Sequence, residues 1–170
     1  MSILQLPLIL ETRRNHAIEH GTIHILGAKF PGQAFAGHSN PTGFIILGDV
    51  ALDDVANAAT QSLTRLRAGE RGLAIHPGCG TNFATSGLLA ATLAWLPLSV
   101  GRTRRTKLFL LPLAILLGVL GYLFAQPFGP IIQAKVTTEA NPGETRITKV
   151  SPVRFGRVKA HYVTTRPTGP

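Results

Sequence analysis

The chain has 170 residues, of which 45% are apolar and only 15% are charged. Because an ordinary soluble domain carries roughly 25% charged residues, this composition points away from such a domain and toward a membrane protein. The net charge of +9 favours an anionic partner such as a membrane surface, and the single cysteine, Cys79, excludes an internal disulfide.

The first fourteen residues, MSILQLPLILETRR, do not have the pattern of a secretory signal. No basic segment precedes the apolar run, and no small-residue cleavage pattern follows it. The run is also too short to span a bilayer. We therefore expect the mature protein to keep its first residue.

Residues 1–82 are expected to form a small α+β domain. The sequence predicts a helix over 11–26 and a pair of short strands within 33–48. An amphipathic helix is predicted over 51–69, because its acidic residues lie in the first turn and its arginines in the last, as the helix dipole favours. A short strand is predicted over 71–77.

Residues 83–125 are expected to form two transmembrane helices. The runs 83–100 and 108–125 carry no charged residue, and each is long enough for a short membrane span. The link 101–107 is too short to hold a domain, so the spans should form a hairpin. Two such uncharged runs are hard to bury in a small protein, which argues against the alternative of a soluble buried hairpin.

Small residues should allow the two helices of the hairpin to approach closely. We expect Gly118 and Gly121 on the second helix to face Ala84, Gly87 and Ala91 on the first. The link between them is basic, which the positive-inside rule places in the cytoplasm. The expected location is the bacterial inner (cytoplasmic) membrane.

Residues 126–170 are expected to form a basic, strand-rich tail. A hairpin is predicted over 131–150, around Asn141-Pro142-Gly143, and a further strand within 153–163. The tail has too few aromatic residues to stack nucleic-acid bases, so we expect no nucleic-acid partner. We expect it to dock on the membrane surface or on a partner protein.

The helix over 11–26 carries the clearest chemical pattern. His16 and His20 lie one turn apart, as two imidazoles must if they are to share one metal ion. Glu19 lies between them in sequence, which gives the arrangement His-x-x-Glu-His of inverted zinc proteases, in which the glutamate acts as a base. The alternative is a pair of hydrogen-bonded core histidines. His24 is expected to make a structural hydrogen bond.

Two histidines are too few for a zinc site, and the segment 74–82 offers further ligands. His76 and Cys79 lie three residues apart across a Pro-Gly turn, which suits two ligands on one tight loop. The two segments would then form a tetrahedral zinc site, with either three protein ligands (His16, His20 and His76) or four (with Cys79 added). The alternative is that this loop only caps the first membrane helix through Thr81 or Asn82.

Three sequence blocks precede the apolar hairpin, namely HAIEHGTIHIL, GFIILGDV and LTRLRAGERGLAIHPGCGTN. This combination resembles an uncharacterised family of small two-span membrane proteins of phototrophic bacteria, over residues 11–125. Since that family has no established activity, the resemblance implies no function. It does imply that the two histidine blocks belong to one site.

Two hypotheses follow from these patterns. The first is a membrane-anchored, zinc-dependent hydrolase of the peptidase kind, with Glu19 as the base. The second is a non-catalytic accessory subunit of a larger photosynthetic or respiratory membrane complex, in which any metal is structural. In the second case the hairpin and the basic tail would be the docking surfaces. The glutamate within the motif favours the first hypothesis, and the small size of the chain favours the second.

Overall fold

The computed structural model describes residues 2–155 and 158–167. The chain divides into two compact units, one formed by residues 1–76 together with 134–170 and the other by residues 77–133.

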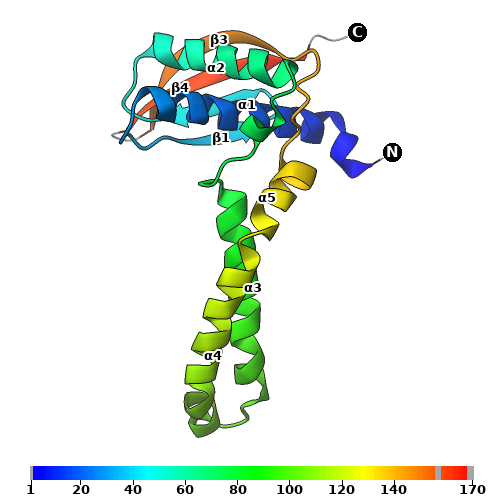
Figure 1. The fold of residues 1–170 in the computed structure, drawn as a ribbon, viewed down its shortest axis with the longest axis vertical. Helices are drawn as coiled ribbons and strands as arrows, with labels where there is room; N and C mark the ends of the chain where they lie inside the picture. Colours follow the sequence, from blue (N-terminus) through cyan, green and yellow to red (C-terminus); the bar gives the residue numbers. More distant parts are fainter. Residues whose placement is uncertain (1, 156–157, 168–170) are drawn as a thin grey trace. The chain divides into compact units, whose positions relative to one another are not determined.

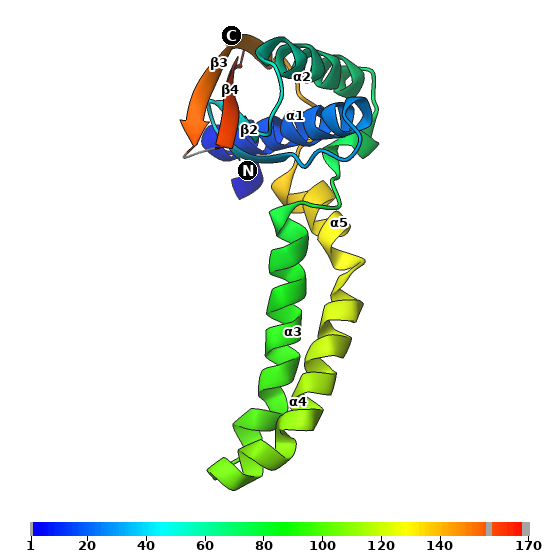
Figure 2. The same ribbon diagram turned by 90° about the vertical axis from the view of Figure 1, so that its left-hand side faces the viewer.

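The first unit has two layers, a pair of long helices and a four-stranded antiparallel sheet. The two helices lie side by side on one face of the sheet, and both views of the ribbon show this arrangement (Figures 1 and 2). Its helices are α1 (Pro7–Lys29) and α2 (Leu52–Arg67), with short 3-10 helices η1 (Ile3–Gln5) and η2 (Arg71–Ala74). Its strands are β1 (Ala36–Asn40), β2 (Gly43–Leu47), β3 (Arg146–Phe155) and β4 (Val158–Arg166).

The strand order is β1-β2-β4-β3, so the last two strands of the chain complete a sheet that the first two begin. The register pairs Phe44 of β2 with Val163 of β4, and both side chains are fully buried. Val55 and Leu63 of α2 belong to the same core, as does Ile18 of α1. The spacing of the apolar residues on α2 places them on one face of that helix. The core of this unit therefore joins segments from both ends of the chain.

The second unit is a helical hairpin with a short additional helix. It consists of α3 (Gly80–Val100), α4 (Arg104–Ala125) and α5 (Phe128–Ile132). Helices α3 and α4 are long and apolar enough to cross a membrane, and only 11% and 17% of their most apolar windows are buried. The core helix of a soluble protein would be mostly buried. A π-helical turn, η3 (Gln133–Thr137), follows α5.

Close packing of small residues in the hairpin is confirmed, but the partners differ from those predicted. A Cβ atom on Gly121 would lie 2.9 Å from the Leu89 carbonyl oxygen and 3.0 Å from the Ala90 Cα. A Cβ atom on Gly118 would lie 3.3 Å from the Ala94 Cβ. The prediction was wrong for Gly87, where a Cβ atom would meet no heavy atom within 4 Å, because the pairing of two helices depends on their relative rotation, which composition does not give.

The helices over 11–26 and 51–69 and the strands within 33–48 are confirmed, but the strand predicted over 71–77 is wrong. Residues 71–74 form the 3-10 helix η2, with backbone hydrogen bonds from Leu73 to Glu70 (3.1 Å) and from Ile75 to Gly72 (3.1 Å). The apolar run here is very short, and periodicity does not separate strand from helix in such a run.

The hairpin predicted over 131–150 is also wrong. Residues 128–137 are helical, and the turn at Pro142-Gly143 leads into β3 instead of joining two strands. The real hairpin pairs β3 with β4 over nine residue pairs, from Arg146 with Arg166 to Phe155 with Val158. A short apolar segment such as Ile131–Ile132 fits either a strand or a helix, so tertiary packing decides between them.

Candidate metal centre

Helix α1 positions three histidines on one side. His16 and His20 lie one turn apart, and their ring centroids are 4.3 Å from each other in an edge-to-face arrangement. His24 lies one turn further along the same helix. The helix thus holds the predicted pair, His16 and His20, in direct ring contact.

His76 joins this helix from a distant part of the sequence. It follows η2, and its ring centroid lies 5.6 Å from that of His20 and 4.9 Å from that of His24. The first unit therefore gathers four histidine rings, contributed by α1 and by the segment after η2. His24, which the sequence assigned only a structural role, lies within this group.

Backbone carbonyl groups orient the three histidines of α1. The Nδ1 atoms of His16 and His20 lie 3.0 Å from the Thr137 oxygen and 2.7 Å from the Ala74 oxygen. The Nε2 atom of His24 lies 2.8 Å from the Ile75 oxygen, so the structural hydrogen bond predicted for His24 is confirmed.

A carbonyl oxygen only accepts hydrogen bonds, so each of these ring nitrogens must carry the proton. In the neutral ring the opposite nitrogen then carries the lone pair, at Nε2 of His16 and His20 and at Nδ1 of His24. Histidines that bind metal ions usually have this arrangement, in which one N–H donates to a carbonyl and the other nitrogen binds the metal.

Cys79 is the remaining ligand candidate. It is not part of a disulfide, and 6% of its surface is exposed. His16, His20 and Cys79 each offer one ligand atom, and as a group they could hold a metal ion. Cys79 is also the N-terminal cap residue of α3, without a side-chain capping bond. The predicted caps Thr81 and Asn82 therefore do not hold that position, although the Asn82 side chain donates to the Pro77 carbonyl (2.8 Å).

Glu19 is buried beside strand β1, with 3% of its surface exposed. The hydroxyl group of Ser39 donates a hydrogen bond to its carboxylate. Burial raises the pKa of Glu19, while the Ser39 hydrogen bond and the charges of His16 and His38 lower it, and the effect of burial is the largest. A Cβ atom on Gly37 would lie 2.5 Å from the Glu19 Oε1 atom, so glycine is needed there to make room for the carboxylate.

His76 is held in the neutral form. Burial, followed by the charges of His24 and His20, lowers the pKa of His76 from 6.5 to about 4. At neutral pH the ring is therefore unprotonated, which is the form that binds a metal ion.

The acidic residues Asp49 and Asp54 of the first unit lie in ion pairs with lysines. Asp49 pairs with Lys159 (2.6 Å) and Asp54 with Lys29 (2.5 Å). Sequence reasoning missed the contributions of Ser39 and of the Thr137 carbonyl. A serine in a strand and a backbone oxygen carry no motif, and only the fold brings them to α1.

A family model described as a domain of unknown function (DUF6391) matches residues 11–150. An uncharacterized protein of Picosynechococcus sp. (strain ATCC 27264 / PCC 7002 / PR-6) is 39% identical over 95 residues. This match covers 51% of the chain and 46% of that protein, so the chain spans about half the length of the relative it matches. No solved structure matches the chain.

Proposed function

The chain belongs to the DUF6391 family, a domain of unknown function, and we propose from its site that it is a membrane-anchored metal-binding protein with zinc-dependent hydrolase activity. In this proposal three of the four candidates His16, His20, His76 and Cys79 hold the metal ion, which leaves one coordination position open. The observation that carries it is the orientation of His16 and His20, whose Nδ1–H groups both donate to backbone carbonyls.

The donor set fits zinc. Imidazole nitrogen and thiolate sulfur are the usual zinc ligands, and three of them would leave the fourth tetrahedral position open to water, as hydrolysis requires. When bound, zinc would supply Lewis acidity toward a water molecule or a carbonyl group. The carbonyl groups of Thr137 and Ala74 would keep His16 and His20 in the required tautomer and ring orientation.

Glu19 is the proposed base. Its raised pKa brings proton exchange at the carboxylate closer to neutral pH, where general bases work best. The Ser39 hydroxyl group fixes the orientation of this carboxylate, and Gly37 leaves space for it. Anchoring in the bacterial inner membrane is supported by α3 and α4, which are long and apolar enough to cross a bilayer.

Metal analysis of the full-length protein, purified in neutral detergent and reloaded with zinc after chelation, tests the metal site. We expect about one zinc ion per chain in the wild type and its loss in the double variant His16→Ala/His20→Ala, because two of the ligands are removed. The matched control is His38→Ala, which removes a histidine outside the four-ring group and should keep the metal. A wild-type protein without stoichiometric metal would contradict the proposal.

The substitution Glu19→Gln separates catalysis from structure. Glutamine keeps the shape and can still accept from Ser39, so the variant should retain zinc. Peptide hydrolysis, measured on a fluorescence-quenched peptide library, should fall by roughly 100-fold or more, because general-base catalysis contributes at least that factor.

A second candidate function is that of a non-catalytic accessory subunit of a larger membrane complex. The observation that favours it is the burial of Glu19 against β1, which also suits a structural carboxylate. In that case Glu19→Gln would bind zinc and would leave the phenotype of the cell unchanged. Co-purification of the chain with a large membrane complex would support this reading.

A further inference from the structure

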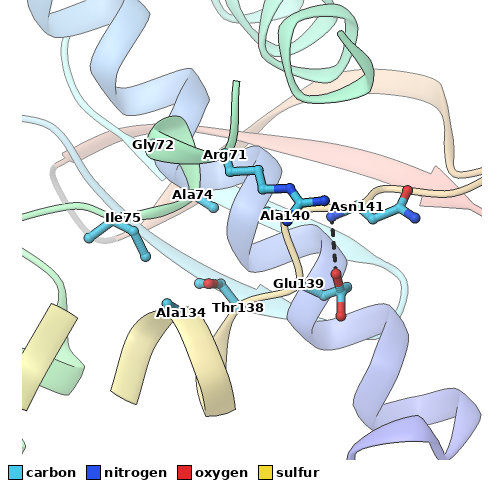
Figure 3. Close-up of a pocket in the computed structure, with 9 residues that line it drawn as sticks. All are labelled: Arg71, Gly72, Ala74, Ile75, Ala134, Thr138, Glu139, Ala140 and Asn141. Atoms are coloured by element: carbon cyan, nitrogen blue, oxygen red, sulfur yellow. Dashed lines mark hydrogen bonds between the residues drawn. The ribbon is translucent and has the colours of Figure 1, made fainter. Parts of the chain in front are cut away.

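The first unit contains a cavity that is separate from the four-histidine group. Its volume is about 580 Å³, and it is lined by residues of two segments, 71–75 and 134–141 (Figure 3). Sites for small molecules usually have volumes of about 300–1,000 Å³, so this cavity is large enough for one. None of the histidines lines it.

Arg71 brings a positive charge to the cavity. In Figure 3 its side chain reaches from η2 across to Ala140 and Asn141 of the opposite segment. Among the described residues, its guanidinium group makes no hydrogen bond or ion pair. The neighbouring acid, Glu70, is paired with Arg65 at 2.6 Å and so does not neutralise Arg71.

The carboxylate in the cavity wall has its own partners. Glu139 lies 3.6 Å from the buried guanidinium group of Arg13, and its Oε1 atom accepts from the backbone N–H of Asn141 (3.1 Å). Arg13 thus balances the charge of Glu139. The cavity is left with one uncompensated positive charge, that of Arg71.

The wall opposite Arg71 is firmly held. Arg13 donates to the carbonyl oxygens of Val136 (2.7 Å) and Thr138 (2.9 Å), and its backbone oxygen accepts from the N–H of Glu139 (3.0 Å). Such a network fixes the segment before any ligand arrives, which lowers the entropic cost of binding.

We propose that this cavity binds a small molecule through an oxyanion group, a phosphate or a carboxylate, that pairs with Arg71. The planar guanidinium group offers two parallel N–H donors, which match the oxygens of either group. The cavity wall also includes Ala74 and Ile75, whose carbonyl groups accept from His20 and His24, so a bound anion would lie next to residues that orient these two histidines. This ligand site is additional to the proposed metal site.

Calorimetric titration of the full-length chain in neutral detergent at low, fixed ionic strength tests this site. Inorganic phosphate and succinate are the soluble probes, and dihexanoyl phosphatidylglycerol is the probe for a lipid headgroup. We expect binding of at least one probe by the wild type, and a loss of affinity of about tenfold or more in Arg71→Ala, since a charged hydrogen bond is removed. The probe that binds most tightly identifies the source of the anion.

Two variants serve as controls. Arg71→Lys keeps the charge but loses the paired donors, so its affinity should lie between those of the wild type and Arg71→Ala. Arg146→Ala removes an exposed arginine on β3 and should bind as the wild type does. Equal affinity of the wild type and Arg71→Ala for every probe, or no binding of any probe, would overturn the proposal.

The double variant His16→Ala/His20→Ala makes the two proposals distinguishable. It should bind the anion without binding zinc, because neither histidine lines the cavity. A wild type that holds zinc but binds every probe no more tightly than Arg71→Ala does would reject the anion site alone. Anion binding by a wild-type protein that holds no zinc after reloading would reject the metal site alone.

Discussion

At the scale of single residues, His76 makes the stability of the metal-free protein depend on pH. Its pKa is about 4 in the folded chain and 6.5 as an ordinary histidine. Between these values the unfolded chain binds more protons, so folded stability rises with pH. The contribution is fully present above about pH 6.5 and is lost as the pH falls toward 4.

We therefore expect the unfolding temperature of the metal-free protein to fall from pH 7 to pH 4, and His76→Ala to make this decrease smaller. The ring is partly exposed, so solvent screening limits its share to roughly 1 kcal/mol. Thermal unfolding followed by circular dichroism at each pH would measure both proteins. An identical slope in His76→Ala would show that another group causes the decrease.

At the scale of elements, the contact between α1 and α2 depends on Gly21. The Ser62 hydroxyl group of α2 donates to the Ile18 carbonyl of α1 at 2.8 Å. A Cβ atom on Gly21 would overlap the Ser62 oxygen and lie 3.1 Å from its Cβ. Because α1 holds three of the four histidines, a shift of this helix also displaces the candidate metal centre.

The substitution Gly21→Ala should destabilise the protein by about 1–3 kcal/mol, the usual cost of overpacking a tight contact. The matched control is Gly27→Ala on the same helix, where a Cβ atom meets no heavy atom within 4 Å. Alanine at that exposed position should raise the free energy of unfolding by up to about 1 kcal/mol, because glycine is a poorer helix former. Denaturant unfolding measures the change in the free energy of unfolding for each variant. Equal changes in Gly21→Ala and Gly27→Ala would show that only helix propensity matters at Gly21 and that its contact with Ser62 does not.

At the scale of the whole molecule, the buried core and the apolar exposed surface belong to different units. The main hydrophobic core lies within residues 1–76 and 134–170, whereas large exposed apolar side chains such as Trp95, Phe109 and Ile115 lie on the hairpin. The first unit therefore contains its own core.

Replacing residues 77–133 with a flexible Gly/Ser linker of about 15 residues should yield a protein that stays monomeric without detergent. It should unfold cooperatively, because its core is retained, and bind zinc more weakly than the full chain, because Cys79 is removed. Size-exclusion chromatography and circular dichroism would test this. Aggregation of this variant in detergent-free buffer would mean that the first unit needs the hairpin in order to fold.

The sequence by itself determined the elements whose signals are local. The spacing of His16 and His20, the charge placement on α2 and the two uncharged runs each depend on residues a few positions apart, so periodicity predicts them. The resemblance over residues 11–125 likewise indicated the family. That His76 joins the histidines of α1 was a hypothesis from the sequence motifs. Its ring contacts with His20 and His24 depend on the fold.

Only the tertiary structure decided how distant segments combine. Residues 128–137 are helical, and β4 pairs with β2 across more than a hundred residues, so the tail completes the sheet of the first unit. The Thr137 carbonyl reaches His16, Ser39 reaches Glu19, and Arg71 faces the segment 134–141 for the same reason. Such contacts arise from burying one shared core, and the free energy of that burial depends on all the packed residues together, which no local pattern records.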